Sequence, residues 1–191
     1  MKKPIAIVIL GRSGCGKGEQ IKLLEKKLKP ALVIHTGALF RALIHTSTLA
    51  GDIAMTFLQK GNLAPTWLAS YMWIDALMCG LNRKKNIIFD GSPRMRGEAK
   101  LLDDVLAWFG RKRVIALYIN ISEKETIRRL LARGRDDDHS LAIKNRLAFF
   151  KRNVLPTINY YRSTKRLISI NGEQSIRQVS IDMFKALRLK K

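Results

Sequence analysis

The chain has 191 residues, of which 36 are Lys or Arg and 15 are Asp or Glu, so its formal net charge is +21. This length favours a single domain with a sizeable buried core. No apolar run approaches the ~20 residues that cross a bilayer, and two cysteines do not make a disulfide framework. These features exclude membrane-spanning and disulfide-stapled classes, and we expect a globular protein of the cytoplasm.

The excess of basic residues points to a polyanionic ligand or surface. These residues are scattered along the chain and at both ends rather than gathered in one block. The simplest interpretation of the charge outside a ligand site is a solvated basic surface. Binding of nucleic acid or of an anionic surface stays open as a less favoured alternative.

A glycine-rich loop near the N-terminus is the most informative stretch. An apolar run over residues 5–10 precedes the loop Gly11-Arg12-Ser13-Gly14-Cys15-Gly16-Lys17, and helical spacing follows over residues 20–28. A strand, a glycine loop and a helix in this order form the context of a phosphate-binding loop. The glycines let consecutive N–H groups face one anion, the helix N-terminus favours negative charge, and Lys17 adds a positive charge. The loop therefore predicts a polyphosphate site.

Short apolar segments alternate with helical patterns through the rest of the chain. We expect further strands at residues 31–35, 86–90, 113–121 and 167–170. After the strand at residues 31–35 we expect helical structure through about residue 50, and then helices over residues 52–60, 66–79, 97–109, 123–133, 141–161 and 175–189. This alternation predicts an α/β fold, in which a five-stranded parallel sheet is flanked by helices and binds ligands at the carboxyl ends of its strands.

Three finer features of these elements can be predicted. We expect Gly51 to separate two helices. We expect Tyr71, Ile74 and Met78 to face the core, because their spacing is that of one helix face. Ser122 and Glu125 have the spacing of a capping box, which would start the helix at residue 123.

Five segments, in order along the chain, resemble the motifs of the adenylate kinase family of nucleoside monophosphate kinases. The segments are Gly16-Lys17-Gly18-Glu19-Gln20, His35-Thr36-Gly37-Ala38-Leu39-Phe40-Arg41, Gly61-Asn62-Leu63-Ala64-Pro65, Asp90-Gly91-Ser92-Pro93-Arg94 with Glu98, and Arg129 to Leu147, and the resemblance extends over almost the whole chain. The resemblance implies reversible phosphoryl transfer from MgATP to AMP, giving two ADP. It also implies a monomer that needs no protein partner and no zinc.

The resemblance further implies a P-loop nucleoside triphosphate hydrolase-like fold with a helical insert and a very short lid. The single kinase domain would span residues 1–191, with its core at 1–35, 66–133 and 147–191, an insert for the nucleoside monophosphate at 36–65 and a lid at 134–146. Phosphoryl transfer depends on positioning and charge neutralisation, which accounts for a site rich in arginine.

Residue roles follow from the resemblance, position by position. ATP would be held by Gly14, Cys15, Gly16, Lys17, Gly18, Glu19 and Arg129. The nucleoside monophosphate would be held by Thr36, Gly37, Arg41, Leu63, Ala64, Gly91, Arg94 and Glu98. The catalytic residues would be Lys17, Arg94, Arg133, Arg135 and Arg146. Asp90 would orient the water ligands of Mg²⁺, because Gly18 offers no hydroxyl to the metal.

Two departures from the family pattern bear on specificity. Glu19 replaces a threonine beside the donor phosphates, so we expect its carboxylate to turn away from them. Glu98 replaces a glutamine that can both donate to and accept from adenine, whereas a carboxylate can only accept. A kinase for GMP or a pyrimidine nucleotide therefore stays open as an alternative, and a non-catalytic relative that binds nucleotide or nucleic acid is a second one.

Overall fold

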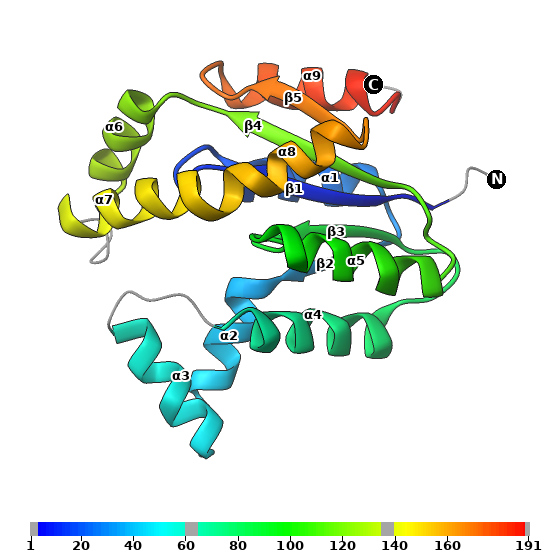
Figure 1. Cartoon of the computed structure of the whole chain (residues 1–191). Helices are drawn as coiled ribbons and strands as arrows, with labels where there is room; N and C mark the ends of the chain where they lie inside the picture. The colour runs from blue at the N-terminus through cyan, green and yellow to red at the C-terminus, as the bar shows by residue number, and fades with distance from the viewer. Residues whose placement is uncertain (1–3, 60–64, 135–139, 190–191) are drawn as a thin grey trace.

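Five parallel strands form the centre of the protein, whose computed structural model describes residues 4–59, 65–134 and 140–189 (Figure 1). The strands are β1 (Ala6–Gly11), β2 (Ala31–His35), β3 (Asn86–Asp90), β4 (Val114–Asn120) and β5 (Leu167–Asn171), in the spatial order β2-β3-β1-β4-β5. The predicted five-stranded parallel sheet is therefore confirmed. Because β1 lies between β3 and β4, the loop that follows β1 emerges at the middle of the sheet's carboxyl edge.

Helices cover both faces of the sheet. One face is covered by α1 (Lys17–Lys27) and α9 (Ile176–Ala186), and the other by α4 (Thr66–Gly80), α5 (Arg96–Trp108) and α8 (Leu155–Ser163). Successive residues of β1 enter opposite cores, with Val8 in the α4/α5/α8 layer and Ile9 in the α1/α9 layer. This two-sided burial explains why the strands read as continuous apolar runs. Within the described residues, none of the helices has the length and apolar character that a bilayer crossing requires.

Four helices surround the carboxyl end of the sheet. They are α2 (Thr36–Ile44), α3 (Leu49–Gln59), α6 (Glu123–Arg133) and α7 (Ser140–Phe149). In Figure 1, α2 and α3 extend below the sheet on the side where α6 and α7 lie above it. The loop after β1 therefore lies between two pairs of helices, α2 with α3 and α6 with α7.

The prediction that Gly51 separates two helices is wrong. The break falls between Ile44 and Leu49, and Gly51 is buried inside α3. A Cβ atom at this glycine would lie 2.5 Å from the carbonyl oxygen of Thr46 and 2.8 Å from that of Leu43. Gly51 therefore permits the close approach of α3 to the end of α2, and its role is packing rather than helix termination.

The predicted core face of α4 is also wrong. Tyr71 is 63% exposed and Met78 is 60% exposed, whereas Trp73 and Leu77 are fully buried. Only Ile74 of the predicted set packs against the core, and it does so as a partly buried residue. The helix is apolar on nearly all sides, so periodicity alone did not identify the face that meets the sheet.

The predicted helix over residues 141–161 is continuous but contains a wide turn. Between α7 and α8 the backbone forms the π-helical turn η1 (Phe150–Val154). Pro156 lies in the first turn of α8, where its missing N–H group costs little. The π turn therefore allows the helix to pass through a proline without breaking.

One of the two hydrogen bonds of the predicted capping box at Ser122 is confirmed. The Ser122 hydroxyl accepts a hydrogen bond from the Glu125 N–H at 3.2 Å. The N–H of Ser122, however, donates to Glu173 instead of to Glu125. The Glu125 carboxylate is thereby left to bind arginines of its own helix.

Candidate active site

The glycine loop has the backbone shape of an anion site. Gly14 and Gly16 both have φ in the left-handed region, at 78° and 90°. The Lys17 ammonium turns back over the loop and donates to the carbonyl oxygens of Gly11 at 3.0 Å and Arg12 at 2.9 Å. The loop therefore combines glycine conformations, a helix N-terminus and a lysine, which is the set of groups that binds a polyphosphate.

Two glycines of the loop are required by close contacts with its surroundings. A Cβ atom at Gly11 would lie 2.6 Å from Cys15 Sγ and 2.7 Å from the carbonyl oxygen of Ile119. A Cβ atom at Gly14 would lie 3.3 Å from the side chain of Leu130 in α6. The loop is thus packed between β4 and α6, and Cys15 is buried inside it.

Arg12 is a member of the loop to which the sequence assigned no role. It donates to the carbonyl oxygen of Ile121 at 2.9 Å and stacks its guanidinium over the Phe150 ring, 4.3 Å from the centroid. It also lies 3.6 Å from a carboxylate oxygen of Glu123. Arg12 therefore ties the phosphate loop to α6 and to the π turn. Its position inside a phosphate loop was the only signal available in the sequence.

Asp90 lies at the carboxyl end of β3, paired in register with Ile9 of β1 and His35 of β2. Its Oδ2 atom is 3.1 Å from Nδ1 of His35. His35 was not predicted to have a role, because its spacing to the other histidines is not that of metal ligands. The pairing of β3 with β1 therefore places the Asp90 carboxylate next to the glycine loop that follows β1.

The residues around Asp90 fit a magnesium ion held mainly by phosphate oxygens and water. Within the described residues there is no group of three or more His, Cys, Asp or Glu side chains that could hold a metal by itself. A Cβ atom at Gly18 would meet nothing within 4 Å, so that position has space but no ligand atom. A single carboxylate is suited to Mg²⁺, which keeps several waters when it binds nucleotide phosphates.

The residues expected to bind the acceptor phosphate lie together around the end of β3. A Cβ atom at Gly91 would lie 3.4 Å from Nη2 of Arg94 and 3.7 Å from Cβ of Thr36. The Thr36 hydroxyl donates to that of Ser92 at 3.0 Å. Arg41 is exposed, and its Nη1 atom lies 3.5 Å from the Cβ position of Gly37.

Arg94 is held in place by two hydrogen bonds. Its Nε atom donates to the carbonyl oxygen of Gly91 at 2.7 Å, and its backbone N–H donates to Glu98 Oε2 at 2.6 Å. Burial lowers the pKa of Arg94. The carboxylates of Glu98 and Asp90 act to raise this pKa, whereas the positive charge of Arg146 acts to lower it further. A guanidinium remains charged under such a shift. Arg146, another of the predicted residues, therefore lies within electrostatic range of Arg94.

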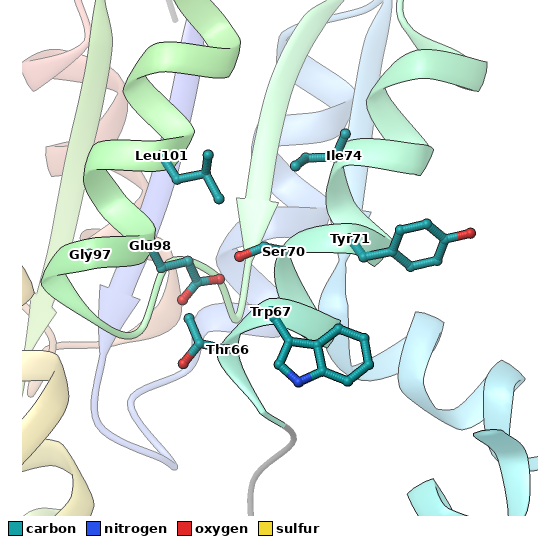
Figure 2. Close-up of a pocket in the computed structure, with 8 residues that line it drawn as sticks. All are labelled: Thr66, Trp67, Ser70, Tyr71, Ile74, Gly97, Glu98 and Leu101. Atoms are coloured by element: carbon teal, nitrogen blue, oxygen red, sulfur yellow. The ribbon is translucent and has the colours of Figure 1, made fainter.

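Glu98 is buried and points toward α4, as Figure 2 shows. Its Oε1 atom accepts a hydrogen bond at 3.2 Å from Nε1 of Trp73, a partner that the sequence did not suggest. A hollow of about 420 Å³ lies beside it, between the first turns of α4 and α5, with Trp67 and Tyr71 among its lining residues. Both oxygens of Glu98 are therefore already engaged, one by Trp73 and one by Arg94.

The donor side of the site is bordered by α6. Arg129 donates to Glu125 of its own helix and, at 3.0 Å, to the carbonyl oxygen of Gly172. Arg128 donates to both oxygens of the same carboxylate. These hydrogen bonds to Arg128 and Arg129 lower the pKa of Glu125 to about 2. Arg129 is thus fixed between its own helix and the loop after β5.

The remaining predicted residues divide into three groups. Arg133 is the last residue of α6, directly before the predicted lid at residues 134–146, and Arg146 is the last residue of that segment and lies in α7. Leu63, Ala64 and Arg135 lie outside the described residues. Glu19 is exposed and pairs with Lys22 at 3.3 Å, so its carboxylate has a cationic partner on the surface of α1.

These features define a class of protein. A phosphate loop after β1, a carboxylate at the end of β3 and clustered arginines meet at the carboxyl edge of a parallel sheet, where such folds bind ligands. The protein is therefore a P-loop nucleotide-binding enzyme whose arginines can neutralise more than one phosphate group.

Comparison with known proteins identifies the family. The sequence model of the adenylate kinase family matches residues 9–166. The chain is 36% identical over 177 residues to an adenylate kinase of Azobacteroides pseudotrichonymphae, covering 91% of this chain and 92% of the relative. It is 33% identical to an adenylate kinase of Corynebacterium urealyticum, covering 91% and 94%, and 31% identical to one of Thermobifida fusca, covering 95% and 97%. The chain belongs to the adenylate kinase family and is a phosphotransferase.

Proposed function

We propose that this enzyme transfers the terminal phosphoryl group of MgATP reversibly to AMP, giving two ADP. The observation that carries the proposal is the meeting of two phosphate-binding groups at one sheet edge. Lys17 and the glycine loop follow β1, and Arg94 with Thr36 and Gly91 follow the adjacent strands β2 and β3. A donor and an acceptor phosphate can therefore be held side by side, as the reaction requires.

On the donor side, the loop from Gly14 to Gly18 holds the phosphates of ATP through its backbone N–H groups. Lys17 exchanges its hydrogen bonds to the loop carbonyls for bonds to the β and γ phosphates. Arg129 provides a planar face for the adenine, and Glu19 stays with Lys22, away from the phosphates. The enzyme thereby binds a tetra-anion without an opposing carboxylate at its centre.

Mg²⁺ supplies charge neutralisation at the phosphate oxygens when MgATP is bound. Asp90 is the residue that would hold it, through water, and His35 holds the carboxylate of Asp90 in place. The rest of the metal's ligands would come from the nucleotide, because Gly18 contributes no side chain.

On the acceptor side, Arg41 and Arg94 bind the phosphate of AMP and bring one of its oxygens into line with the γ phosphorus. The new P–O bond forms as the bond to the β-phosphate oxygen breaks, and the charge on the transferring group is shared by Arg94, Arg133, Arg135 and Arg146. No proton transfer is needed, since both oxygens carry negative charge. The four arginines therefore act by electrostatic stabilisation.

Two parts of the chain close over the nucleotides in this proposal. The insert at residues 36–65, which contains α2 and α3, covers AMP together with Leu63 and Ala64, and the short lid at 134–146 covers ATP. Closure excludes water, so that the phosphoryl group reaches AMP rather than being hydrolysed. We expect the enzyme to act as a monomer, because both moving parts need free space. We expect it to do so in the cytoplasm.

A coupled assay that compares AMP, GMP, CMP, UMP and dTMP as acceptors tests the proposal. We expect kcat/KM for AMP to exceed that for every other acceptor. GMP is the main competitor, because the Glu98 carboxylate can accept hydrogen bonds from adjacent N–H groups of guanine but can donate none to adenine. Faster phosphorylation of GMP than of AMP would show that GMP is the acceptor. The reaction would still be phosphoryl transfer to a nucleoside monophosphate.

Lys17→Ala separates catalysis from simple binding. Loss of this charge should reduce kcat by at least about 100-fold, the effect of removing a group that stabilises developing charge. The variant should retain the unfolding transition of the wild type, because Lys17 contacts only the carbonyls and Cys15 of its own loop. ADP formation that survives in Lys17→Ala would assign the activity to a contaminant and favour a non-catalytic binding protein.

A further inference from the structure

The edge of the sheet opposite the active site carries a concentration of basic residues that nucleotide binding does not use. The connections that lead into β2, β3, β4 and β5 are residues 28–30, 81–85, 109–113 and 164–166. Together they contain nine Lys or Arg residues and no Asp or Glu. Because all the strands are parallel, these four connections lie at one edge of the sheet, on the right in Figure 1.

Six of these basic side chains are exposed and have no carboxylate partner among the residues that the structure describes. We call them the basic edge: Lys29, Arg83, Lys84, Lys112, Arg113 and Lys165. The other three have structural partners, such as Arg166, which pairs with Asp103 at 2.6 Å. The basic edge therefore carries uncompensated positive charge that attracts anions.

Arg111 joins two of the four connections of the basic edge. Its Nη2 atom donates to the carbonyl oxygens of Asn82 at 3.1 Å, Arg83 at 3.0 Å and Lys85 at 3.3 Å. A side chain of one connection thus holds the backbone of its neighbour. The backbone that carries Arg83 and Lys84 is consequently held in place before a ligand binds.

The charges form a row, because the connections follow the strand order. Lys29 precedes the outer strand β2 and Lys165 precedes the outer strand β5, with the charges of the β3 and β4 connections between them. Neighbouring strands are about 4.8 Å apart, so the row is about 20 Å long. A row of this length matches a few consecutive phosphates of a single-stranded chain.

An aromatic side chain lies at the same edge. Trp108, the last residue of α5, is 74% exposed and packs edge-on against Phe109, which precedes Arg111. An exposed indole beside basic side chains can stack on a nucleobase. Membrane contact is less suited to this surface, because the four connections expose no large apolar side chain and the single indole of Trp108 beside them offers little apolar area to a bilayer.

We propose that the basic edge binds single-stranded nucleic acid through its backbone phosphates, with Trp108 stacking on a base. This site is separate from the nucleotide site, since the length of the strands, about 20 Å, lies between the two edges of the sheet. The enzyme can therefore hold a polynucleotide and carry out phosphoryl transfer at the same time.

The test is fluorescence anisotropy of a labelled oligouridylate of about 20 nucleotides at about 0.1 M salt. AMP and a non-transferable ATP analogue are present, so that the nucleotide site is occupied. We expect the quadruple variant R83E/K84E/K112E/R113E to lose at least about tenfold in affinity and to show a weaker salt dependence, by about 0.7 in slope for each lost phosphate contact.

A matched control reverses four exposed basic side chains at the other end of the molecule. The variant K124E/K144E/R152E/R177E changes the net charge equally and should lose less than about threefold in affinity, because only charges near the bound strand contribute fully. The milder pair R83Q/K84Q avoids a folding defect and should weaken binding in the same direction. Trp108→Ala should weaken binding by about tenfold through loss of stacking.

Several outcomes would overturn the proposal. Absence of binding by the wild type at about 0.1 M salt would do so, as would equal losses in the edge and control variants. Binding to phosphatidylserine vesicles in the absence of oligouridylate binding would assign the basic edge to a membrane instead. The affinity for an oligothymidylate of the same length, compared with that for the oligouridylate, shows whether DNA or RNA is bound more tightly. None of these results depends on phosphotransferase activity.

Discussion

Glu98 illustrates how a single residue of the site is constrained by a partner from another element. Its two oxygens accept from the indole of Trp73 and from the backbone N–H of Arg94. Each carboxylate oxygen can accept a further bond, but the group can donate none. Glu98 therefore fixes the Arg94 loop, and in the proposed function it could only accept hydrogen bonds from the acceptor base.

Glu98→Gln should destabilise the protein by about 1–3 kcal/mol, because one N–H donor would then face the amide NH₂ group and remain unsatisfied. The loss should be smaller when Trp73→Phe is already present, because only the Arg94 N–H then needs an acceptor. Denaturant unfolding of the two single variants and the double variant measures this coupling. Additive losses would show that Trp73 and Glu98 do not interact in solution.

The sequence predicts the side chains that we assign to nucleotide binding, but it does not predict the side chains that hold them in place. The glycine loop, Asp90 and Arg94 follow from short motifs whose chemistry is local. Arg12 and Trp73 were missed, because each acts through a partner more than 20 positions away, Phe150 and Glu98 respectively. Such pairs depend on how helices pack, which residue spacing in a single chain does not report.

At the scale of an element, α6 is stabilised by charge at its N-terminal turn. Glu125 binds Arg128 and Arg129 one turn later, and Arg129 reaches the loop after β5. The carboxylate thus links the order of α6 to the position of an arginine that we assign to ATP binding.

The contribution of Glu125 to stability should depend on pH in a defined window. Its pKa is lowered from 4.5 to about 2, so the stabilisation is fully present above about pH 4.5 and is lost as the pH falls toward 2. The difference in unfolding free energy between the wild type and Glu125→Gln should accordingly shrink from pH 5 to about pH 3. Denaturant titrations measure it. A difference that is equal at both pH values would show that the charge of Glu125 has no part in it.

The elements themselves were largely predictable, and the exceptions have a common cause. Every strand was located within about two residues, the usual uncertainty of such boundaries, because a strand buried on both faces is marked by apolar residues alone. The break near Gly51, the core face of α4 and the π turn before Pro156 were not predicted, since each is decided by contacts with a neighbouring element. Tertiary packing overrides local preference at these places.

At the scale of the whole molecule, opposite edges of the sheet carry different kinds of positive charge. At the carboxyl edge, arginines are held by neighbours such as Gly91, Glu98 and Glu125. At the other edge, six exposed cations have no carboxylate partner within the described part of the chain. The net charge of +21 therefore has an energetic cost that any anion can reduce.

Chloride salt should stabilise the folded protein for this reason. Raising NaCl from about 0.02 M to about 0.5 M shortens the screening length and reduces self-repulsion. We expect the midpoint of thermal unfolding to rise by about 2–4 °C, which corresponds to about 1 kcal/mol for a chain of this size. Differential scanning calorimetry measures it, and R83E/K84E/K112E/R113E, with its lower net charge, should show a smaller rise. A midpoint that falls with salt would mean that attractive ion pairs outweigh the repulsion.

The continuous helical path from Ser140 to Ser163 gives the molecule a lever. Its outer arm, α7, contains most of the segment predicted to act as the lid, and its inner arm, α8, is packed on the sheet. A stiff arm of ten residues is about 15 Å long, so a pivot of about 20° at the π turn would displace its tip by about 5 Å. A rotation confined to one turn of backbone would thus move the far end of α7 by several ångströms, through a path that is helical from end to end.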